Sequence, residues 1–221
     1  MSKYTILNPT PFETHMLVYG MIEEGSKVLD VGCATGYIAQ KLKEKNCKIW
    51  GAEIDKEAAR TAKRYCEDIV IADLGKIKKL PFNNNFFDYI LLLDVLEHLK
   101  SPDYLLELIK PHLKKNGKII ISVPNIAFIS IRIALLLGRF DYKEMGIMDE
   151  THLRFFTQKT FLELMAKSNL KLLELDFSSG FSQITKIGKY LNHIPKYWQY
   201  QISKFWPTLL AYQFIAVVTI Y

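Results

Sequence analysis

Three acidic residues and two histidines stand where a small polar molecule could be held and a proton moved. Asp30, Glu53 and Asp73 each lie in or follow a short apolar run, and His98 and His152 lie further along the chain. A carboxylate only accepts hydrogen bonds, so it suits ammonium or hydroxyl donors on a ligand. Histidine titrates near neutral pH and can take up a proton. These residue types indicate ligand binding coupled to proton transfer.

One of these acids belongs to the stretch VLDVGCATGYIA, residues 28–39, which is typical of a strand, a tight turn and a helix. Gly32 and Gly36 let the backbone bend and approach a ligand closely, and Ala34 is small enough to do nearly the same. Free amides at the start of the helix could receive a carboxylate or phosphate. A dinucleotide fingerprint would need glycine where Tyr37 stands, so a nicotinamide-dependent dehydrogenase is disfavoured.

Apolar runs that alternate with helical patterns must position these residues. Strands are expected over residues 27–31, 48–54, 68–72, 89–93, 118–123, 170–177 and 210–220. Helices are expected over residues 37–45, 56–65, 101–113, 126–137 and 158–167, with caps at Asp55, Ser101 and Thr157 and ends at Asn46 and Gly117. The pattern predicts an α/β fold: a doubly wound, Rossmann-like, seven-stranded and mostly parallel sheet. We expect an antiparallel C-terminal strand, preceded by a helical insert.

Composition limits the class of protein. The chain has 221 residues, 49% of them hydrophobic, and a net charge of +6, which predicts one globular domain with a mild basic excess. Cys33, Cys47 and Cys66 show neither metal-ligand spacing nor a paired framework, as expected of reduced cytosolic thiols. The N-terminus has no secretion-signal pattern, and the apolar stretch 126–137 is too short to span a bilayer. We therefore expect a cytoplasmic protein.

The pattern D-x-G-x-A-x-G that begins at Asp30 resembles the first motif of class I S-adenosylmethionine-dependent methyltransferases, with Ala34 in place of a glycine. Three further segments, WGAEID, IADLG and LDVLEH, resemble later motifs of that family in the right order. The last is similar to the "VLEH" version of small-molecule O-methyltransferases. The resemblance implies S-adenosylmethionine as the cofactor and S-adenosylhomocysteine as the product.

The resemblance also assigns roles to residues. Glu53 would grip the ribose hydroxyls, Asp73 would accept from the adenine amino group, and Asp30 would face the methionine ammonium group. Ile54 and Leu74 would sandwich the adenine ring. The implied cofactor-binding set is Asp30, Gly32, Cys33, Ala34, Gly36, Glu53, Ile54, Asp73 and Leu74. The single domain would divide into an N-terminal helix within 1–25 that covers the cofactor, a cofactor-binding core over 26–125 and acceptor-side elements over 126–221.

The segment GRFDYKEMGIMDETHLRFFT, residues 138–157, resembles bacterial methyltransferases of cell-surface polysaccharide biosynthesis. A sugar or another small hydroxyl compound is therefore the expected acceptor. His98 and His152 are candidate bases, and Arg154 and Asp149 are candidate substrate-binding residues. The alternatives are structural: His98 could orient its loop, and His152 with Arg154 could form a corner. His15, near the N-terminus, is expected to be structural.

Other functions stay open. An RNA or protein methyltransferase is one alternative, although the N/D-P-P-Y/F motif of base-amine methylation is absent and a nucleic-acid acceptor is disfavoured. A non-catalytic cofactor-binding protein or scaffold is another. Asp141, Asp149 and Glu150 could offer oxygens to a metal, but no spacing fixes a metal site.

The segment 178–206 is basic and aromatic, with lysines interleaved among tyrosines and tryptophans and no acid. It could form a lid over the acceptor, a peripheral membrane contact, a homodimer contact, or a helical hairpin packed on the sheet.

Overall fold

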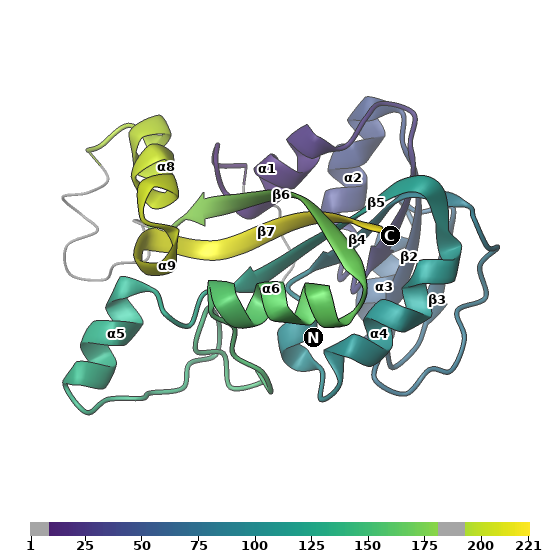
Figure 1. The fold of residues 1–221 in the computed structure, drawn as a ribbon. Helices are drawn as coiled ribbons and strands as arrows, with labels where there is room; N and C mark the ends of the chain where they lie inside the picture. Colours follow the sequence, from purple (N-terminus) through teal and green to yellow (C-terminus); the bar gives the residue numbers. More distant parts are fainter. Residues whose placement is uncertain (1–8, 181–192) are drawn as a thin grey trace.

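The computed structural model describes residues 9–180 and 193–221. Seven strands form one sheet in the order β3-β2-β1-β4-β5-β7-β6 (Figure 1). The strands are β1 Lys27–Val31, β2 Lys48–Glu53, β3 Asp68–Ile71, β4 Phe87–Leu93, β5 Leu113–Pro124, β6 Leu170–Ser179 and β7 Ala211–Ile220. Strands β1 to β5 pair in parallel, and β7 pairs antiparallel with both β5 and β6. The predicted fold class is confirmed, including the antiparallel strand at the C-terminus.

Helices cover both faces of this sheet. They are α1 Thr14–Met21, α2 Tyr37–Leu42, α3 Lys56–Ala62, α4 Pro102–Ile109, α5 Ile129–Leu136, α6 Gln158–Lys167, α8 Lys196–Phe205 and α9 Pro207–Leu210. Single 3₁₀ turns are η1 Lys43–Lys45, η2 Leu96–His98 and η3 Lys110–His112. Two apolar cores result, because neighbouring residues of a strand point to opposite faces. Val28 packs in the core that includes α1 and α2, and Leu29 in the core that includes α4 and α6.

Local signals in the sequence explain several element ends. The carboxylate of Asp55 accepts hydrogen bonds from the N–H groups of Glu57 at 2.8 Å and Ala58 at 3.0 Å, which caps α3 as predicted. Thr157 and Thr160 form a capping box at the start of α6. Asn46 adopts a left-handed φ of 54° after η1, in keeping with its predicted role as a stop.

The predicted helix over 101–113 is wrong in its last turn. Helix α4 ends at Ile109, because Pro111 lacks an N–H and its ring clashes with a helical backbone. Strand β5 then begins at Leu113, so Gly117 lies inside a strand and does not end a helix. A Cβ at Gly117 would lie 2.7 Å from Cγ of Leu113, so close packing explains this glycine. Ser101 forms no side-chain cap.

The acceptor-side half is less regular. Helix α5 is shorter than the predicted 126–137. The predicted insert 178–206 contains the end of β6, α8 and the loop before α8, but its residues 181–192 lie outside the described part of the chain. Within the described residues, no helix combines the length and the apolar character needed to cross a membrane.

Candidate functional site

Three left-handed residues shape the turn between β1 and α2. Gly32, Ala34 and Gly36 have φ values of 79°, 47° and 78°. A Cβ at Gly32 would lie 2.6 Å from Cγ2 of Val95, and one at Gly36 would lie 2.8 Å from Cα of Ala62. Both glycines are therefore needed for conformation and for space. The turn lies at the carboxyl end of β1, between β2 and β4, where open α/β sheets bind their ligands.

Glu53 fixes this turn to the end of β2. Its Oε2 accepts a hydrogen bond from the Ala34 N–H at 2.8 Å, and its Oε1 accepts from the N–H groups of Ile54 at 2.8 Å and Asp55 at 2.9 Å. Three backbone donors hold the carboxylate in one orientation. Because two carboxylate oxygens offer about four acceptor positions, capacity for a ligand hydroxyl remains.

Asp30 is the least satisfied group of the turn. Its side chain is buried, and its Oδ2 has no hydrogen-bond partner within the described part of the chain. Burial, and secondarily the charge of Glu53, raise the pKa of Asp30 to about 7. A buried carboxylate oxygen without a partner is costly, so a ligand that donates a hydrogen bond or carries positive charge would be stabilised here. This orphaned oxygen and the narrow glycine turn fit the methionine end of the implied cofactor.

The other predicted cofactor residues differ in accessibility. Ile54 is 61% exposed, whereas Leu74 is buried in the apolar core, so Ile54 has more surface to offer an adenine ring. Asp73 accepts a hydrogen bond from the Gly75 N–H and forms an ion pair with Lys76 at 2.8 Å, and both interactions lower its pKa. Cys33 is buried, and burial raises the pKa of its thiol far above the usual range, so it packs as an apolar residue.

A cavity of about 590 Å³ opens beside the turn. Gly32 and Ala34 line it together with residues from the ends of β4, β5 and β7, from α5 and from the loop after α5. The polar groups that line it include Glu13, His15, Asp94, Glu97, His98, Lys143, His152, Tyr212 and Gln213. The predicted cofactor turn and the predicted base histidines therefore share one space.

Glu97 is a site residue that the sequence analysis missed. It lies in η2, is 1% exposed, and neither of its carboxylate oxygens has a hydrogen-bond partner among the described residues. Burial is the main cause that raises its pKa well above the usual range, and the charge of Asp94 adds to it. The available signal was its place beside His98 in LDVLEH, directly after a buried strand.

His98 and His152 lie against each other beside Glu97. Their ring centroids are 4.8 Å apart in an edge-to-face arrangement. Nδ1 of His152 lies 3.1 Å from the carbonyl oxygen of Ile147, so it donates a hydrogen bond there and leaves Nε2 as the acceptor. Burial and the neighbouring His98 lower the pKa of His152, which keeps it neutral. Nδ1 of His98 lies 3.3 Å from the Thr151 carbonyl oxygen.

Backbone contacts explain why these distant segments meet. The Glu97 carbonyl oxygen accepts hydrogen bonds from the N–H groups of Leu153 at 2.8 Å and Arg154 at 2.9 Å. The Arg154 guanidinium donates two hydrogen bonds to the Lys100 carbonyl oxygen, at 2.6 and 3.1 Å. Asp149 is fully buried and accepts from the N–H and hydroxyl of Thr151.

Arg154 and Asp149 therefore hold the loop in place. Neither belongs to the described residues that line the cavity. The geometry gives no support to the prediction that they contact the acceptor, and it favours the alternative in which Arg154 forms a structural corner.

The same cluster offers the donor set for a metal ion. One ligand atom from each of Glu97, His98 and His152 lies within 4.8 Å of the others. Carboxylate and imidazole ligands suit zinc and similar divalent cations. A metal ion would therefore find its ligands in this cluster and not at Asp141, Asp149 and Glu150, the acids considered from the sequence; Asp141 pairs with Arg139 at 2.7 Å.

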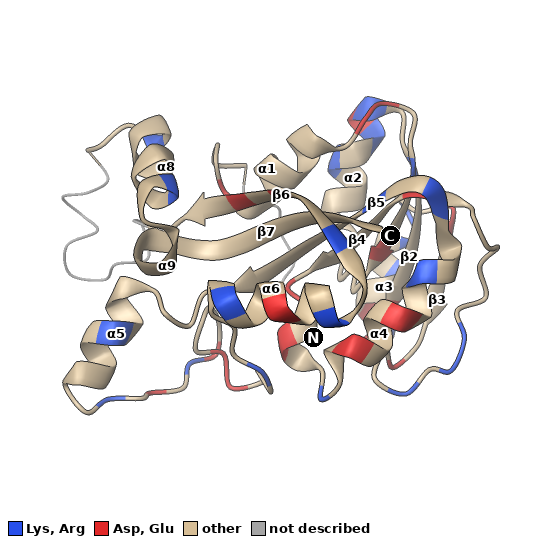
Figure 2. Cartoon of the chain, in the orientation of Figure 1, with Lys and Arg blue, Asp and Glu red and all other residues tan. Residues whose placement is uncertain are grey.

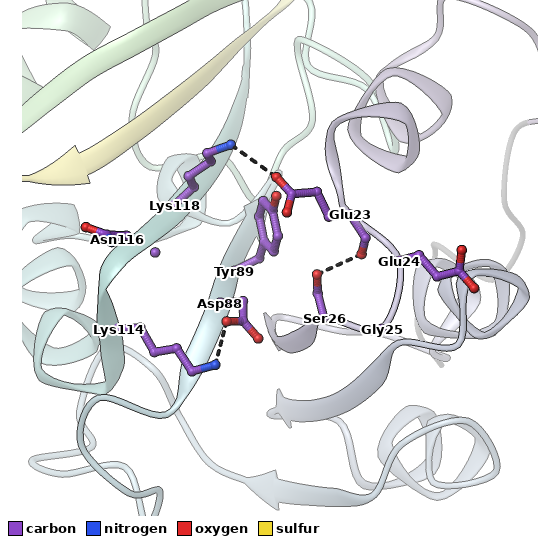
Figure 3. A pocket seen from close by; sticks show the side chains of 10 residues that line it. Glu23, Glu24, Gly25, Ser26, Asp88, Tyr89, Lys114, Asn116 and Lys118 are labelled. Atoms are coloured by element: carbon purple, nitrogen blue, oxygen red, sulfur yellow. Dashed lines mark hydrogen bonds and ion pairs between the residues drawn. The ribbon is translucent and has the colours of Figure 1, made fainter.

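A second cavity, of about 320 Å³, lies at the opposite edge of the sheet, near the amino ends of β1 and β4 (Figure 3). Lys114 and Asp88 form an ion pair there at 2.5 Å, and Lys118 and Glu23 form one at 3.7 Å. Both of its lysines are paired with acids of the same cavity, and it lies away from the glycine turn. The 590 Å³ cavity is therefore the better candidate site.

Comparisons with known proteins agree with this geometry. A family model described as a methyltransferase domain matches residues 12–175. An uncharacterized protein of Methanocaldococcus jannaschii is 30% identical over 161 residues, 73% of this chain and 72% of that protein. The ubiquinone biosynthesis O-methyltransferase of Pelagibacter ubique is 24% identical over 156 residues, 68% of this chain and 63% of that enzyme.

Solved structures show the same fold. A SAM-dependent methyltransferase from Archaeoglobus fulgidus superimposes with a TM-score of 0.62 and 17% identity, covering 93% of both chains. The matched family segment contains the glycine turn, Glu53, Asp73 and the Glu97 cluster. The chain therefore belongs to the methyltransferase domain family and is an S-adenosylmethionine-dependent methyltransferase.

Proposed function

We propose that this enzyme methylates a hydroxyl group of a small molecule, a sugar or a related metabolite. The observation that carries the proposal is the shared cavity, in which the glycine turn meets Glu97, His98 and His152. Its volume of about 590 Å³ lies in the range of small-molecule sites. A hydroxyl must lose its proton during methylation, and a histidine with a free Nε2 beside the turn suits that task.

The cofactor would occupy the turn and the ends of β1 to β3. Asp30 would accept from the methionine ammonium group, Glu53 from the ribose hydroxyls and Asp73 from the adenine amino group. Gly32, Ala34 and Gly36 leave room for close approach, and Ile54 offers an apolar surface for the ring. When bound, S-adenosylmethionine supplies an electrophilic methyl group.

The Glu97 cluster would handle the acceptor. His152 is held by the Ile147 carbonyl oxygen with Nε2 available, so it can accept the hydroxyl proton. Glu97, whose carboxyl is protonated more readily than usual, can exchange a proton with the histidines. His98, which contacts Thr151, would position His152 through their ring contact. A positioned base contributes about 10²–10⁴-fold to rate.

Two further observations bear on the acceptor and the compartment. The relative from Pelagibacter ubique is named an O-methyltransferase, which favours oxygen as the acceptor atom here as well. The three cysteines are free and buried, as expected of a reducing compartment such as a bacterial cytoplasm. The link to cell-surface polysaccharides rests on the resemblance of residues 138–157.

Calorimetric titration with S-adenosylmethionine, S-adenosylhomocysteine and NAD tests the cofactor. We expect micromolar binding of the two adenosyl compounds and none of NAD. Glu53→Ala should weaken binding by about 1–3 kcal/mol, because hydrogen bonds to a charged group are lost. The control is Glu57→Ala, which changes an exposed acid on α3. If neither adenosyl compound binds the folded protein, the scaffold alternative replaces the enzyme.

A panel of sugars and other hydroxyl compounds, with methylated product detected by mass spectrometry, tests the acceptor. His152→Ala should lower turnover about 10²–10⁴-fold while cofactor affinity stays unchanged. Methylation of RNA or protein, with no product from any small hydroxyl compound, would overturn the proposed acceptor class.

A further inference from the structure

Helix α5 exposes an apolar surface that is unusual for a globular protein. Its sequence, ISIRIALL, is apolar except at Ser130 and Arg132, yet each of its eight residues is exposed or half-buried. Leu136 is 86% exposed, and Leu137, directly after the helix, is 69% exposed. A helix that is apolar all round is normally buried. The exposed apolar side chains of α5 are therefore expected to contact a partner that covers them.

The surface continues beyond α5. Phe140, Tyr142 and Met145 follow it in sequence and are also exposed. Helix α9 lies beside α5, because the Arg132 guanidinium donates a hydrogen bond to the Thr208 carbonyl oxygen at 2.9 Å (Figure 1). Phe205, 89% exposed, and Trp206 lie where α8 meets α9. We call these exposed residues the apolar end: Ile133, Leu136, Leu137, Phe140, Tyr142, Phe205 and Trp206.

Positive charge accompanies the apolar end. The described segments 126–146 and 193–210, which form or adjoin the apolar end, together contain five lysines and arginines and two acids, a net charge of +3. Figure 2 shows basic residues on α5 and α8. Arg132 bonds to the carbonyl oxygens of Ala127 and Thr208, which carry no net charge, so its charge still attracts anions. Leucine and aromatic side chains edged by lysine and arginine are the composition that settles in the headgroup region of anionic membranes.

We propose that the apolar end docks onto the surface of an anionic lipid bilayer. With eight residues, α5 is about 12 Å long, too short to span a membrane but suited to lie in its interface. Ser130 and Ile131 of α5, with Lys143 and Met145, also line the 590 Å³ cavity. Docking would thus bring that cavity to the headgroups and let an amphiphilic acceptor enter from the membrane. This last step rests on the proposed function, but docking itself does not.

Sedimentation of the full chain with lipid vesicles tests the proposal. One set of vesicles contains phosphatidylcholine alone, and the other contains phosphatidylcholine mixed with phosphatidylglycerol. We expect binding to the mixed vesicles, weakened by added salt because surface charge attraction is screened. Leu136→Glu combined with Leu137→Glu should lower the partition coefficient by at least roughly tenfold, since it replaces apolar side chains with charges that the lipid repels.

The matched control is Leu172→Glu combined with Leu173→Glu, a pair of adjacent exposed leucines on β6. It should bind vesicles as the unchanged chain does. Circular dichroism checks that each variant folds, and Leu136→Glu alone replaces the double variant if that one does not fold. No vesicle methylation is measured, so failure of docking leaves the proposed function standing, and failure of cofactor titration leaves docking standing.

Three results would overturn the proposal. In the first, the unchanged chain does not bind the mixed vesicles. In the second, the glutamate pairs at Leu136 and Leu137 and at Leu172 and Leu173 weaken vesicle binding equally, and in the third the chain binds neutral vesicles as tightly as anionic ones. Light scattering adds a distinct outcome: a dimer that Leu136→Glu with Leu137→Glu converts to a monomer, without vesicle binding, would assign the apolar end to a second copy of this chain.

Discussion

Glu53 and Glu97 are both buried glutamates at the carboxyl end of the sheet, but their surroundings differ. Three backbone N–H groups from the glycine turn and the end of β2 bind the Glu53 carboxylate. The Glu97 carboxyl has no such partner in the described residues, although its backbone carbonyl oxygen accepts two hydrogen bonds. The fold therefore fixes the carboxylate of Glu53. It positions the backbone of Glu97 but gives its carboxyl group no hydrogen-bond partner among the described residues.

This difference suggests a division of work between the two regions. The turn is already ordered without a ligand, because three backbone donors orient Glu53. The cavity keeps an unsatisfied carboxyl and two touching histidines, which costs folding free energy. Such a cost is expected where a proton, a metal ion or an acceptor completes the set. If this division holds, changes at the turn should affect stability and cofactor binding, whereas changes at Glu97 should affect turnover.

The largest expected effect comes from Glu97→Gln. An amide has nearly the same shape as the carboxyl but cannot exchange a proton, so kcat should fall about 100–1,000-fold. The free energy of unfolding should stay the same or rise, because a neutral amide is cheaper to bury than an unpaired acid. Turnover assays and urea unfolding measure both quantities.

Glu107→Gln is the matched control for that change. Glu107 lies on α4 with its side chain 59% exposed and paired with Lys110, so neither activity nor stability should change. An unchanged kcat in folded Glu97→Gln would show that the unpaired carboxyl has no part in the reaction, and the contrast with Glu53 would then be structural only.

Gly36→Ala should damage the turn through sterics. The new Cβ would lie 2.8 Å from Cα of Ala62 at a φ of 78°, so backbone strain and a backbone clash combine. We expect a loss of about 2–4 kcal/mol in the free energy of unfolding, with weaker cofactor binding. Gly138→Ala is the control, because Gly138 has a φ of 71° with nothing within 4 Å. Equal losses in the two variants would mean that φ alone, and not close packing, makes glycine necessary.

The regular parts of the molecule could be predicted because their causes are local. An apolar run such as residues 89–93, an acid that caps α3 and a glycine turn after β1 each act within a few neighbouring residues. The start of β5 was missed because KKNGK is polar and looks like a loop, and only pairing with β4 makes its beginning a strand. Tertiary context overrides propensity there.

The cavity was only partly predictable for the same reason. His98 and His152 were candidates because of their chemistry, but their ring contact joins segments 54 positions apart. Glu97 is recognised by its burial and by the missing hydrogen-bond partners of its carboxyl among the described residues, and the neighbouring residues in the sequence determine neither property. Arg154 was a candidate substrate-binding residue because of its chemistry, yet its guanidinium donates hydrogen bonds to the Lys100 carbonyl oxygen.

A smaller effect concerns the pH dependence of stability. The pKa of Asp30 is raised to about 7 in the folded chain, against about 4 in an unfolded one, so the folded state binds the extra proton. Its contribution is present below about pH 4 and is lost as the pH rises through about 7. Urea unfolding without cofactor should therefore give a lower free energy near pH 8 than near pH 5. Asp30→Asn should reduce that difference by about 1–3 kcal/mol.

Glu13 provides the comparison, because burial raises its pKa to about 7 as well, while Lys196 lowers it in part. Glu13→Gln should reduce the pH dependence too, but it should leave cofactor affinity closer to that of the unchanged chain than Asp30→Asn does. A pH profile that Asp30→Asn leaves unaltered would show that burial does not raise the pKa of Asp30 in the folded protein.

The smallest effect should come from Ala34→Gly, which restores the family's glycine. Ala34 has a φ of 47°, where an L side chain costs about 1 kcal/mol and glycine does not. Glycine also raises the conformational entropy of the unfolded chain, so the net gain in the free energy of unfolding should be only about 0.5 kcal/mol. The Ala34 N–H that binds Glu53 is retained, so cofactor affinity should hold. Paired thermal unfolding and calorimetry decide the matter: a loss of affinity with a gain in stability would mean that the methyl group of Ala34, which lines the cavity, contacts the ligand itself.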